Sequence, residues 1–163
     1  MTEDRREFLL LATGGVVSCA SLRASAQAGS RSGFKAIAFD ALVIFDPRRV
    51  AALAETLFPG KGPSIVNAWR TRQFDYQWLR ALSGRYVDFL QATEESLLFV
   101  ARQLQLELSA DKRQQLMSAW SNLQVWPDVP DSINALRKAG LRLAFLSNMT
   151  AAVLSDGLKK SPD

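Results

Sequence analysis

A single carboxylate at the end of an apolar run is the residue in this sequence best suited to chemistry. Residues 34–39 have the pattern of a short buried strand, and Asp40 follows them directly. In α/β proteins, the carboxyl end of a parallel strand is where ligands bind and where a nucleophile can be presented. Two residues further on, a magnesium-dependent phosphoryl-transfer site would need a second carboxylate, but the residue there is Leu42. The pattern therefore predicts a carboxylate nucleophile that works without a metal.

A second apolar run also ends in polar residues. Residues 141–146 have the pattern of a strand, and Ser147 and Asn148 follow them. A helical pattern that begins at Asp131, which we expect to be its N-cap, ends at Gly140 just before this strand. A strand, a crossover helix and a second strand make a right-handed parallel unit. We therefore expect the two polar strand ends to meet at one edge of a sheet.

The residues between the two strands have helical patterns. Helices are expected over 47–58, 63–82, 93–106 and 109–123, with a short helical or turn element at 85–89. Thr93, followed by two glutamates, is the expected N-cap of the third of these helices. The helical block would then be an insertion that lies over the carboxyl edge of the sheet as a cap.

Composition excludes several kinds of site. At 163 residues, with 48% apolar and 22% charged residues, the chain has the size and composition of one globular domain. It has no histidine, which excludes catalytic triads and zinc sites that use imidazole. Its one cysteine, Cys19, lies in a segment that we expect to be removed. The net charge of +4 comes from scattered basic residues, so we expect no nucleic-acid partner.

Residues 1–28 have the pattern of an export signal. Arg5 and Arg6 precede an apolar stretch too short to span a bilayer, and residues 26–28 form a small-x-small cleavage pattern. The arginine pair resembles a twin-arginine signal, which predicts a periplasmic protein with no stable membrane insertion after cleavage. One alternative is a lipid anchor on Cys19, because residues 16–19 resemble a lipobox. Another is a retained amphipathic helix. Residues 29–33 read as a flexible linker.

Motifs spread along most of the chain resemble those of a known family. They are Phe58–Gly62, Trp69-Arg70, Tyr76–Arg80, Arg85–Phe89, Gln91–Glu94, Val129–Ser132 and Leu146–Asn148. In this combination the chain resembles the L-2-haloacid dehalogenases of the haloacid dehalogenase superfamily, over roughly residues 34–156. The resemblance implies an α/β fold in which a partial doubly wound parallel core, residues 34–47 and 127–163, carries an inserted helical cap, residues 48–126. It also implies a possible homodimer through the cap helices.

The resemblance implies a metal-free and cofactor-free mechanism. Asp40 would attack the halogen-bearing carbon of a short L-2-haloalkanoic acid, and water would then hydrolyse the ester to a 2-hydroxy acid. Arg70 corresponds to the arginine of the family's cap that receives the halide and holds the substrate anion. The substrate carboxylate would contact Ser147 and the backbone N–H of Ala41.

The family's remaining binding roles fall on three more residues. Asn148 would contribute to the halide cradle, and Phe74 and Phe89 would line an apolar pocket. Simpler interpretations stand beside these roles. Asp40 would be only a strand-end cap, and Arg70 an ion-pair partner of Asp75 or of another acid. Ser147 and Asn148 would form a turn, and the aromatic residues would be packing.

The chain departs from the family in two places. Residues 42–44 replace a Tyr-Gly-Thr-Leu loop, and we expect Val43 and Ile44 to continue the strand and displace Asp40. The chain also ends at Asp163, so we expect a truncated member without the later strands. In the family these strands carry a lysine that pairs with the nucleophile and groups that position water. On this basis we expect the helical cap to be better folded than the core.

Three functions follow from these patterns. The first is a 2-haloacid dehalogenase, with activity doubtful in a truncated chain. The second is a non-catalytic remnant that acts as a helical interaction module. The third is a phosphatase of the same superfamily, which Leu42 disfavours because that position would need an acid.

Overall fold

The computed structural model describes residues 33–160. The predicted export signal, the lipidation alternative at Cys19 and most of the predicted linker lie outside the described residues and stay predictions from the sequence. None of the described helices is both long enough and apolar enough to cross a membrane.

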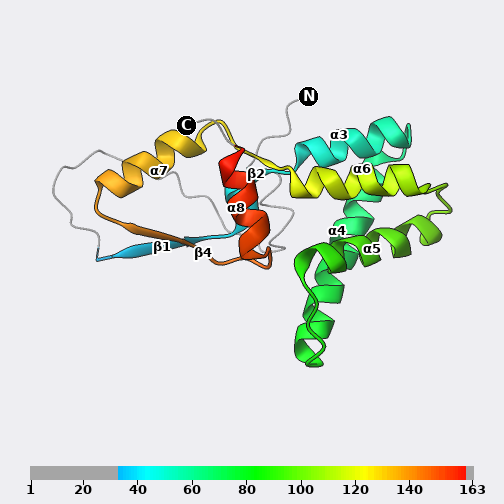
Figure 1. Ribbon diagram of the computed structural model, residues 1–163, viewed down its shortest axis with the longest axis horizontal. Helices are drawn as coiled ribbons and strands as arrows, with labels where there is room; N and C mark the ends of the chain where they lie inside the picture. Colours follow the sequence, from blue (N-terminus) through cyan, green and yellow to red (C-terminus); the bar gives the residue numbers. More distant parts are fainter. Residues whose placement is uncertain (1–32, 161–163) are drawn as a thin grey trace, which may run out of the picture. The chain divides into compact units, whose positions relative to one another are not determined.

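Two parallel strands form the sheet that carries Asp40. β1 (Ala36–Phe39) pairs with β4 (Arg142–Phe145), with Phe39 opposite Phe145. The helix α7 (Val129–Lys138) precedes β4, and Gly140 ends this connection with a φ of 80° that suits glycine. The predicted order of strand, crossover helix and parallel strand is confirmed (Figure 1). The expectation that residues 34–39 form a buried strand is wrong, because every residue of β1 is exposed or half-buried in this two-stranded sheet.

The residues after Asp40 form one turn of helix, α2 (Ala41–Ile44), so the expectation that Val43 and Ile44 continue the strand is wrong. Asp40 accepts a hydrogen bond from the N–H of Leu42 at 2.9 Å, which is an N-cap interaction. Ala41 and Ile44 are spaced to share one face of a helical turn, and both are buried. A helical turn therefore buries two apolar side chains together, which an alternating strand would separate.

A second pair of short strands connects the core to the helical insertion. β2 (Phe45–Asp46) leads into the insertion, and β3 (Gln124–Val125) returns from it; the two pair antiparallel. The last described helix, α8 (Ala151–Lys159), packs against this pair at Phe45. Thr150 caps α8 by accepting a hydrogen bond from Val153 N–H.

Four helices make up the insertion: α3 (Arg48–Leu57), α4 (Gly62–Leu82), α5 (Phe89–Gln103) and α6 (Ala110–Ser121). α3 packs against both α4 and α6, and α5 packs against α4 (Figure 1). We call these helices the cap. Ser109 caps α6, because its hydroxyl accepts from Lys112 N–H at 3.3 Å.

Two predicted N-caps are wrong. α5 begins at Phe89, and its N-cap is Asp88, whose carboxylate accepts from Gln91 N–H at 2.8 Å; Thr93 lies inside the helix. Residues 85–88 carry no helix. α7 begins at Val129, which places Asp131 in its first turn instead of at the cap. A carboxylate there still suits the positive end of the helix dipole.

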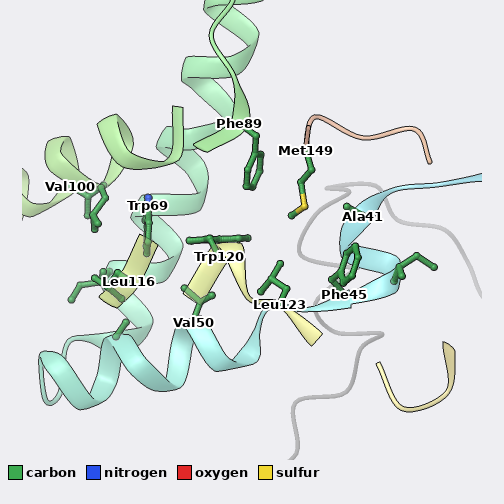
Figure 2. Close-up of a cluster of buried hydrophobic side chains, with 14 of the residues drawn as sticks. Ala41, Phe45, Val50, Trp69, Phe89, Val100, Leu116, Trp120, Leu123 and Met149 are labelled. Atoms are coloured by element: carbon green, nitrogen blue, oxygen red, sulfur yellow. The ribbon is translucent and has the colours of Figure 1, made fainter. Parts of the chain in front are cut away.

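One cluster of buried side chains runs from the cap to the core. Trp120 lies at its centre, with the rings of Trp69 and Phe89 edge-on to it at centroid distances of 6.0 Å and 5.7 Å. Figure 2 shows Phe89, from the cap, and Met149, from the loop after β4, on the same side of this centre. Ala41 belongs to the same cluster. The cap and the site-bearing core therefore share apolar packing.

The close approach of α8 to Phe45 makes a testable prediction. A Cβ atom at Gly157 would lie 2.7 Å from the Phe45 ring. That ring is buried and stacks on Phe145 at 6.1 Å, so it has little room to move. Gly157→Ala should therefore destabilise the protein by about 1–3 kcal/mol, although the same change at an open helical site stabilises by roughly 1 kcal/mol. Urea unfolding measures the difference.

Ser155→Ala, at an exposed position of the same helix, is the matched control and should change stability by less than about 0.5 kcal/mol. A Gly157→Ala variant as stable as the wild type would show that α8 does not pack on Phe45 in this way.

Candidate active site

Asp40 is an exposed carboxylate at the carboxyl end of β1. The strand places Asp40 at the edge of the sheet, and hydrogen bonding to the α2 turn orients its carboxylate. Oδ1 accepts the N–H of Leu42 at 2.9 Å, while the Asp40 carbonyl accepts the N–H of Val43 at 3.2 Å. A carboxylate at the N-terminus of a helical turn is favourably placed next to the turn's N–H groups.

Ser147 and Asn148 lie at the same edge of the sheet as Asp40. The N–H of Leu146 donates to the carbonyl of Phe39 at 2.9 Å, which extends the parallel pairing by one residue beyond the strands. The expectation that the two polar strand ends meet is therefore confirmed. The Ser147 hydroxyl oxygen accepts from Met149 N–H at 3.2 Å, so the turn interpretation of this segment also holds. Asn148 is exposed.

Arg70 lies on α4 directly after the buried Trp69 and is itself partly buried. Partial burial removes water from the guanidinium and lowers the pKa of Arg70 from its ordinary value. Asp75, the partner considered for Arg70, forms an ion pair with Arg72 at 3.5 Å. A cation that has lost part of its hydration shell is a good receptor for an anion.

A buried polar connection between α4 and α5 fixes the helix that carries Arg70. The indole N–H of Trp69 donates to the carbonyl of Thr93 at 2.8 Å, and the Gln73 amide donates to the Thr93 hydroxyl. That hydroxyl donates in turn to the carbonyl of Phe89 at 2.6 Å. Thr93 therefore joins the helix of Arg70 to the first turn of the helix of Phe89. Sequence patterns missed this role because they assigned Thr93 to a cap.

The two phenylalanines predicted for the pocket have different surroundings. Phe89 is 7% exposed and packs in the shared cluster with Ala41 and Met149 (Figure 2). Phe74, one turn after Arg70 on α4, is 42% exposed. The packing interpretation therefore fits Phe89 as well as the pocket interpretation does, while Phe74 lies outside the buried cluster.

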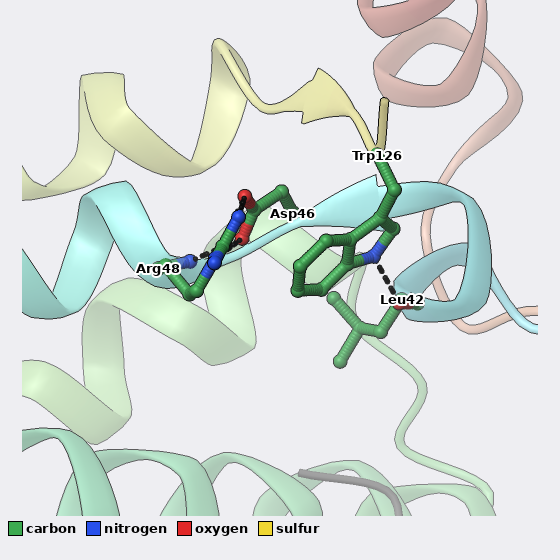
Figure 3. A network of polar contacts seen from close by, with 4 residues as sticks. All are labelled: Leu42, Asp46, Arg48 and Trp126. Carbon is green, nitrogen blue, oxygen red and sulfur yellow. Dashed lines mark hydrogen bonds and ion pairs between the residues drawn. The ribbon is translucent and has the colours of Figure 1, made fainter. Parts of the chain in front are cut away.

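A polar network that the sequence did not predict lies beside Asp40. The indole N–H of Trp126 donates to the carbonyl of Leu42 at 3.2 Å, and the guanidinium of Arg48 lies over the Trp126 ring at 4.6 Å. Asp46 holds Arg48 through both carboxylate oxygens (Figure 3). The spacing of these residues in the sequence gives no signal for the contact, because Trp126 is 84 positions from Leu42.

Asp40 is thus an exposed carboxylate at the same sheet edge as the Ser147-Asn148 segment. The helix α4, which contributes Trp69 to the buried cluster, carries the partly buried Arg70 guanidinium. Within residues 33–160, no group of three or more acidic, histidine or cysteine side chains is arranged to hold a metal ion. An exposed carboxylate can act as a nucleophile, and a partly buried guanidinium can hold an anion.

No protein-family model matches the chain. It is 45% identical over 115 residues to an (S)-2-haloacid dehalogenase of Pseudomonas sp. (strain YL), a match that covers 70% of this chain and 50% of that protein. It is 38% identical over 135 residues to an (S)-2-haloacid dehalogenase of Xanthobacter autotrophicus, covering 79% and 53%. A haloacetate dehalogenase of Moraxella sp. (strain B) is 35% identical over 128 residues, covering 78% and 57%. The chain spans about half the length of these curated relatives.

Solved structures agree with these matches. A crystal structure of an L-2-haloacid dehalogenase superposes with a TM-score of 0.77 at 35% identity, covering 80% of this chain and 60% of that one. The Xanthobacter autotrophicus enzyme with chloropropionic acid covalently bound gives a TM-score of 0.68 at 35% identity, covering 78% and 51%. The predicted fold class, a partial parallel α/β core with an inserted helical cap, is confirmed.

The connection through Thr93 makes a second prediction. Thr93→Val keeps the shape of the side chain and removes the hydroxyl, which leaves the buried Gln73 amide without this acceptor. The free energy of unfolding should fall by about 1–3 kcal/mol. Thr56→Val is the matched control, because Thr56 makes the same bond to the carbonyl four residues earlier, at 3.0 Å, but is exposed. Equal losses in the two variants would contradict a connecting role for Thr93.

Proposed function

Because the chain is a homologue of the L-2-haloacid dehalogenases of the haloacid dehalogenase superfamily, we propose that it removes halide from short L-2-haloalkanoic acids. The observation that carries this proposal is the position of Asp40. It follows a parallel strand, and its neighbour at the sheet edge is the Ser147-Asn148 segment. Homology supports this class of reaction, and the exposed carboxylate at the sheet edge supports the choice of Asp40 as the nucleophile.

In the proposed first step, a carboxylate oxygen of Asp40 attacks C2 of the substrate. The new C–O bond forms as the carbon–halogen bond breaks, and the halide leaves with the bonding electron pair from the opposite side. The configuration at C2 is inverted and an aspartyl ester results. The reaction needs a charged, accessible carboxylate, and the exposure of Asp40 at the strand end supports this role.

In the proposed second step, water attacks the carbonyl carbon of the Asp40 ester. The bond between the carboxyl carbon and the ester oxygen breaks, and one proton of the water goes to that oxygen, which leaves as the hydroxyl of the 2-hydroxy acid. The other proton is released to solvent as the Asp40 carboxylate is restored. The N–H of Ala41, the first residue of α2, would donate to the substrate carboxylate or to the oxyanion of this step.

Arg70 would receive the departing halide and hold the anionic substrate. Its partial burial on α4 and the lowered pKa that follows from burial support this role, because an anion replaces the missing water. The guanidinium still stays charged at any pH of practical interest. Ser147 would hydrogen-bond the substrate carboxylate, and Asn148 would contribute to the halide site.

Phe89 and Phe74 would provide the apolar part of the pocket. The packing of Phe89 in the cluster shared by the cap and the core supports this role. An apolar surround takes water from the attacking carboxylate and makes it more reactive. We also propose, from the sequence of residues 1–28 alone, that the chain is exported to the periplasm.

A second candidate function rests on the exposed apolar surface of α4. Phe74, Trp78 and Leu82 follow one another at four-residue spacing and are 42%, 66% and 82% exposed. A helix that exposes large apolar side chains in a row is typical of an interaction surface. This surface supports both the homodimer expected through the cap helices and the alternative of a non-catalytic helical interaction module.

Halide release tests the enzymatic proposal. The purified chain should release chloride from L-2-chloropropionate and leave the D enantiomer intact. Asp40→Ala should release none, because the nucleophile is lost. Arg70→Ala should lower kcat/KM by about 100-fold or more, as expected when a charge partner of a bound anion is removed.

Arg72→Ala is the matched control for Arg70, since it removes the same charge two residues further along the same helix from a residue paired with Asp75. It should change kcat/KM by no more than about threefold. Chloride release by Asp40→Ala would overturn the proposed nucleophile, and a folded wild-type chain that releases no chloride would favour the interaction module.

The dimer prediction has its own test. Trp78→Glu places a charge within the exposed apolar row on α4 and should turn a dimer into a monomer in light scattering coupled to gel filtration. Arg102→Glu, in the last turn of α5, is the control and should leave the mass unchanged. A monomeric wild type would contradict the prediction directly.

A further inference from the structure

The helical turn that orients Asp40 is too short to be stable alone. α2 has four residues, and isolated helices of this length do not form in water because the first turn fixes many dihedral angles for few hydrogen bonds. Its last carbonyl groups have no partners within the turn and must find them elsewhere. Whatever satisfies those carbonyls therefore also holds the turn in place.

Trp126 provides hydrogen bonds to two of these carbonyls. Its indole N–H donates to the carbonyl of Leu42 at 3.2 Å, and its backbone N–H donates to the carbonyl of Ile44 at 2.9 Å. Leu42 is thus held from both sides: its N–H binds the Asp40 carboxylate, and its carbonyl binds the Trp126 side chain. Figure 3 shows the indole directed at the Leu42 carbonyl.

The indole ring is itself held in a fixed position. Trp126 is 5% exposed, and the Arg48 guanidinium lies over its ring at 4.6 Å. Asp46 binds Arg48 in a two-pronged arrangement, with the shortest N–O distance 2.7 Å, and also accepts the backbone N–H of Arg48 at 2.9 Å (Figure 3). The contacts on the indole therefore come from the start of α3 on one side and from α2 on the other.

We propose that Trp126 is the positioning residue for the Asp40 carboxylate, acting through Leu42. The proposal rests on Asp40 being the nucleophile of the proposed function. Because Trp126 follows β3 directly, the strand that returns from the cap sets the direction of the carboxylate at the end of β1. The Asp40 carboxylate accepts the N–H of Leu42, so a small displacement of Leu42 would turn the carboxylate with it. An attacking oxygen tolerates little misalignment.

The first test does not depend on activity. The amide proton resonance of Leu42, measured by NMR on the full chain, reports its hydrogen bond to Asp40. Asp40→Ala gives the position of this resonance without the bond. Trp126→Phe keeps the aromatic face for Arg48 and the backbone N–H but removes the indole donor. It should move the Leu42 resonance at least half of the way to the Asp40→Ala position.

Trp69→Phe is the matched control for this measurement. It also removes a buried indole donor to a backbone carbonyl, at 2.8 Å, but within the cap. The Leu42 resonance should then stay at its wild-type position. Arg48→Met leaves Trp126 intact and removes the cation over its ring. It should move the Leu42 resonance a smaller distance in the same direction. This variant provides the test if Trp126→Phe does not fold. A Leu42 resonance that neither Trp126→Phe nor Arg48→Met moves would overturn the proposal.

The second test separates orientation from binding. In Trp126→Phe, kcat for chloride release should fall about tenfold while KM stays within about twofold, because Arg70 and Ser147, which would hold the substrate anion, lie outside α2. An unchanged kcat would overturn the proposal. If the wild type releases no chloride, the proposed function fails, and the Leu42 resonance still decides whether Trp126 holds the Asp40 carboxylate.

Discussion

The parallel hydrogen bonding between β1 and β4 is the constraint on which the candidate site depends. It sets Phe39 opposite Phe145 and continues for one more bond, from Leu146 N–H to the Phe39 carbonyl. Two segments that are far apart in the sequence therefore end at the same edge, one with a carboxylate and the other with a hydroxyl and an amide. If the register slipped by one residue, the side chains that meet at this edge would point to opposite faces of the sheet.

The cap is tied to this edge by two kinds of contact. Apolar packing around Trp120 extends from Trp69 and Phe89 to Met149 and Ala41. Hydrogen bonds from Trp126 reach the turn that follows Asp40. Packing holds the cap near the core but has no direction, whereas the indole hydrogen bond has a direction and acts beside the carboxylate. This difference explains why we assign the orientation of Asp40 to Trp126 and not to the larger apolar cluster.

Homology to the L-2-haloacid dehalogenases and the arrangement of the strand ends support the same chemistry from independent directions. The chain spans about half the length of the curated relatives, so its own activity is a proposal that halide release decides. The exposed apolar row on α4 gives the second function a physical basis, because burying that row needs a partner surface. A dimer interface at Trp78 and Leu82 is compatible with catalysis, since both side chains are exposed on the cap and lie outside the buried cluster, whereas the non-catalytic module is an alternative to catalysis.

Periodicity and strand-end chemistry, read from the sequence alone, indicated the helical insertion, the parallel unit and the place of Asp40, Ser147 and Asn148, because these follow from local patterns and from the handedness of crossovers. They gave no signal for α2 or for the pairing of β2 with β3. Predictions from local patterns were wrong where the burial of side chains determined the secondary structure. Thr93 has the residue type of a cap but is drawn into the α4–α5 interface, and Val43 and Ile44 favour strand but lie in a helical turn that buries Ala41 and Ile44. The contact between Trp126 and Leu42 had no signal in the sequence, because it joins residues 84 positions apart through one side-chain hydrogen bond. Only the tertiary structure brings such groups together, because the sequence gives the type of each side chain, whereas folding determines its direction and its neighbours.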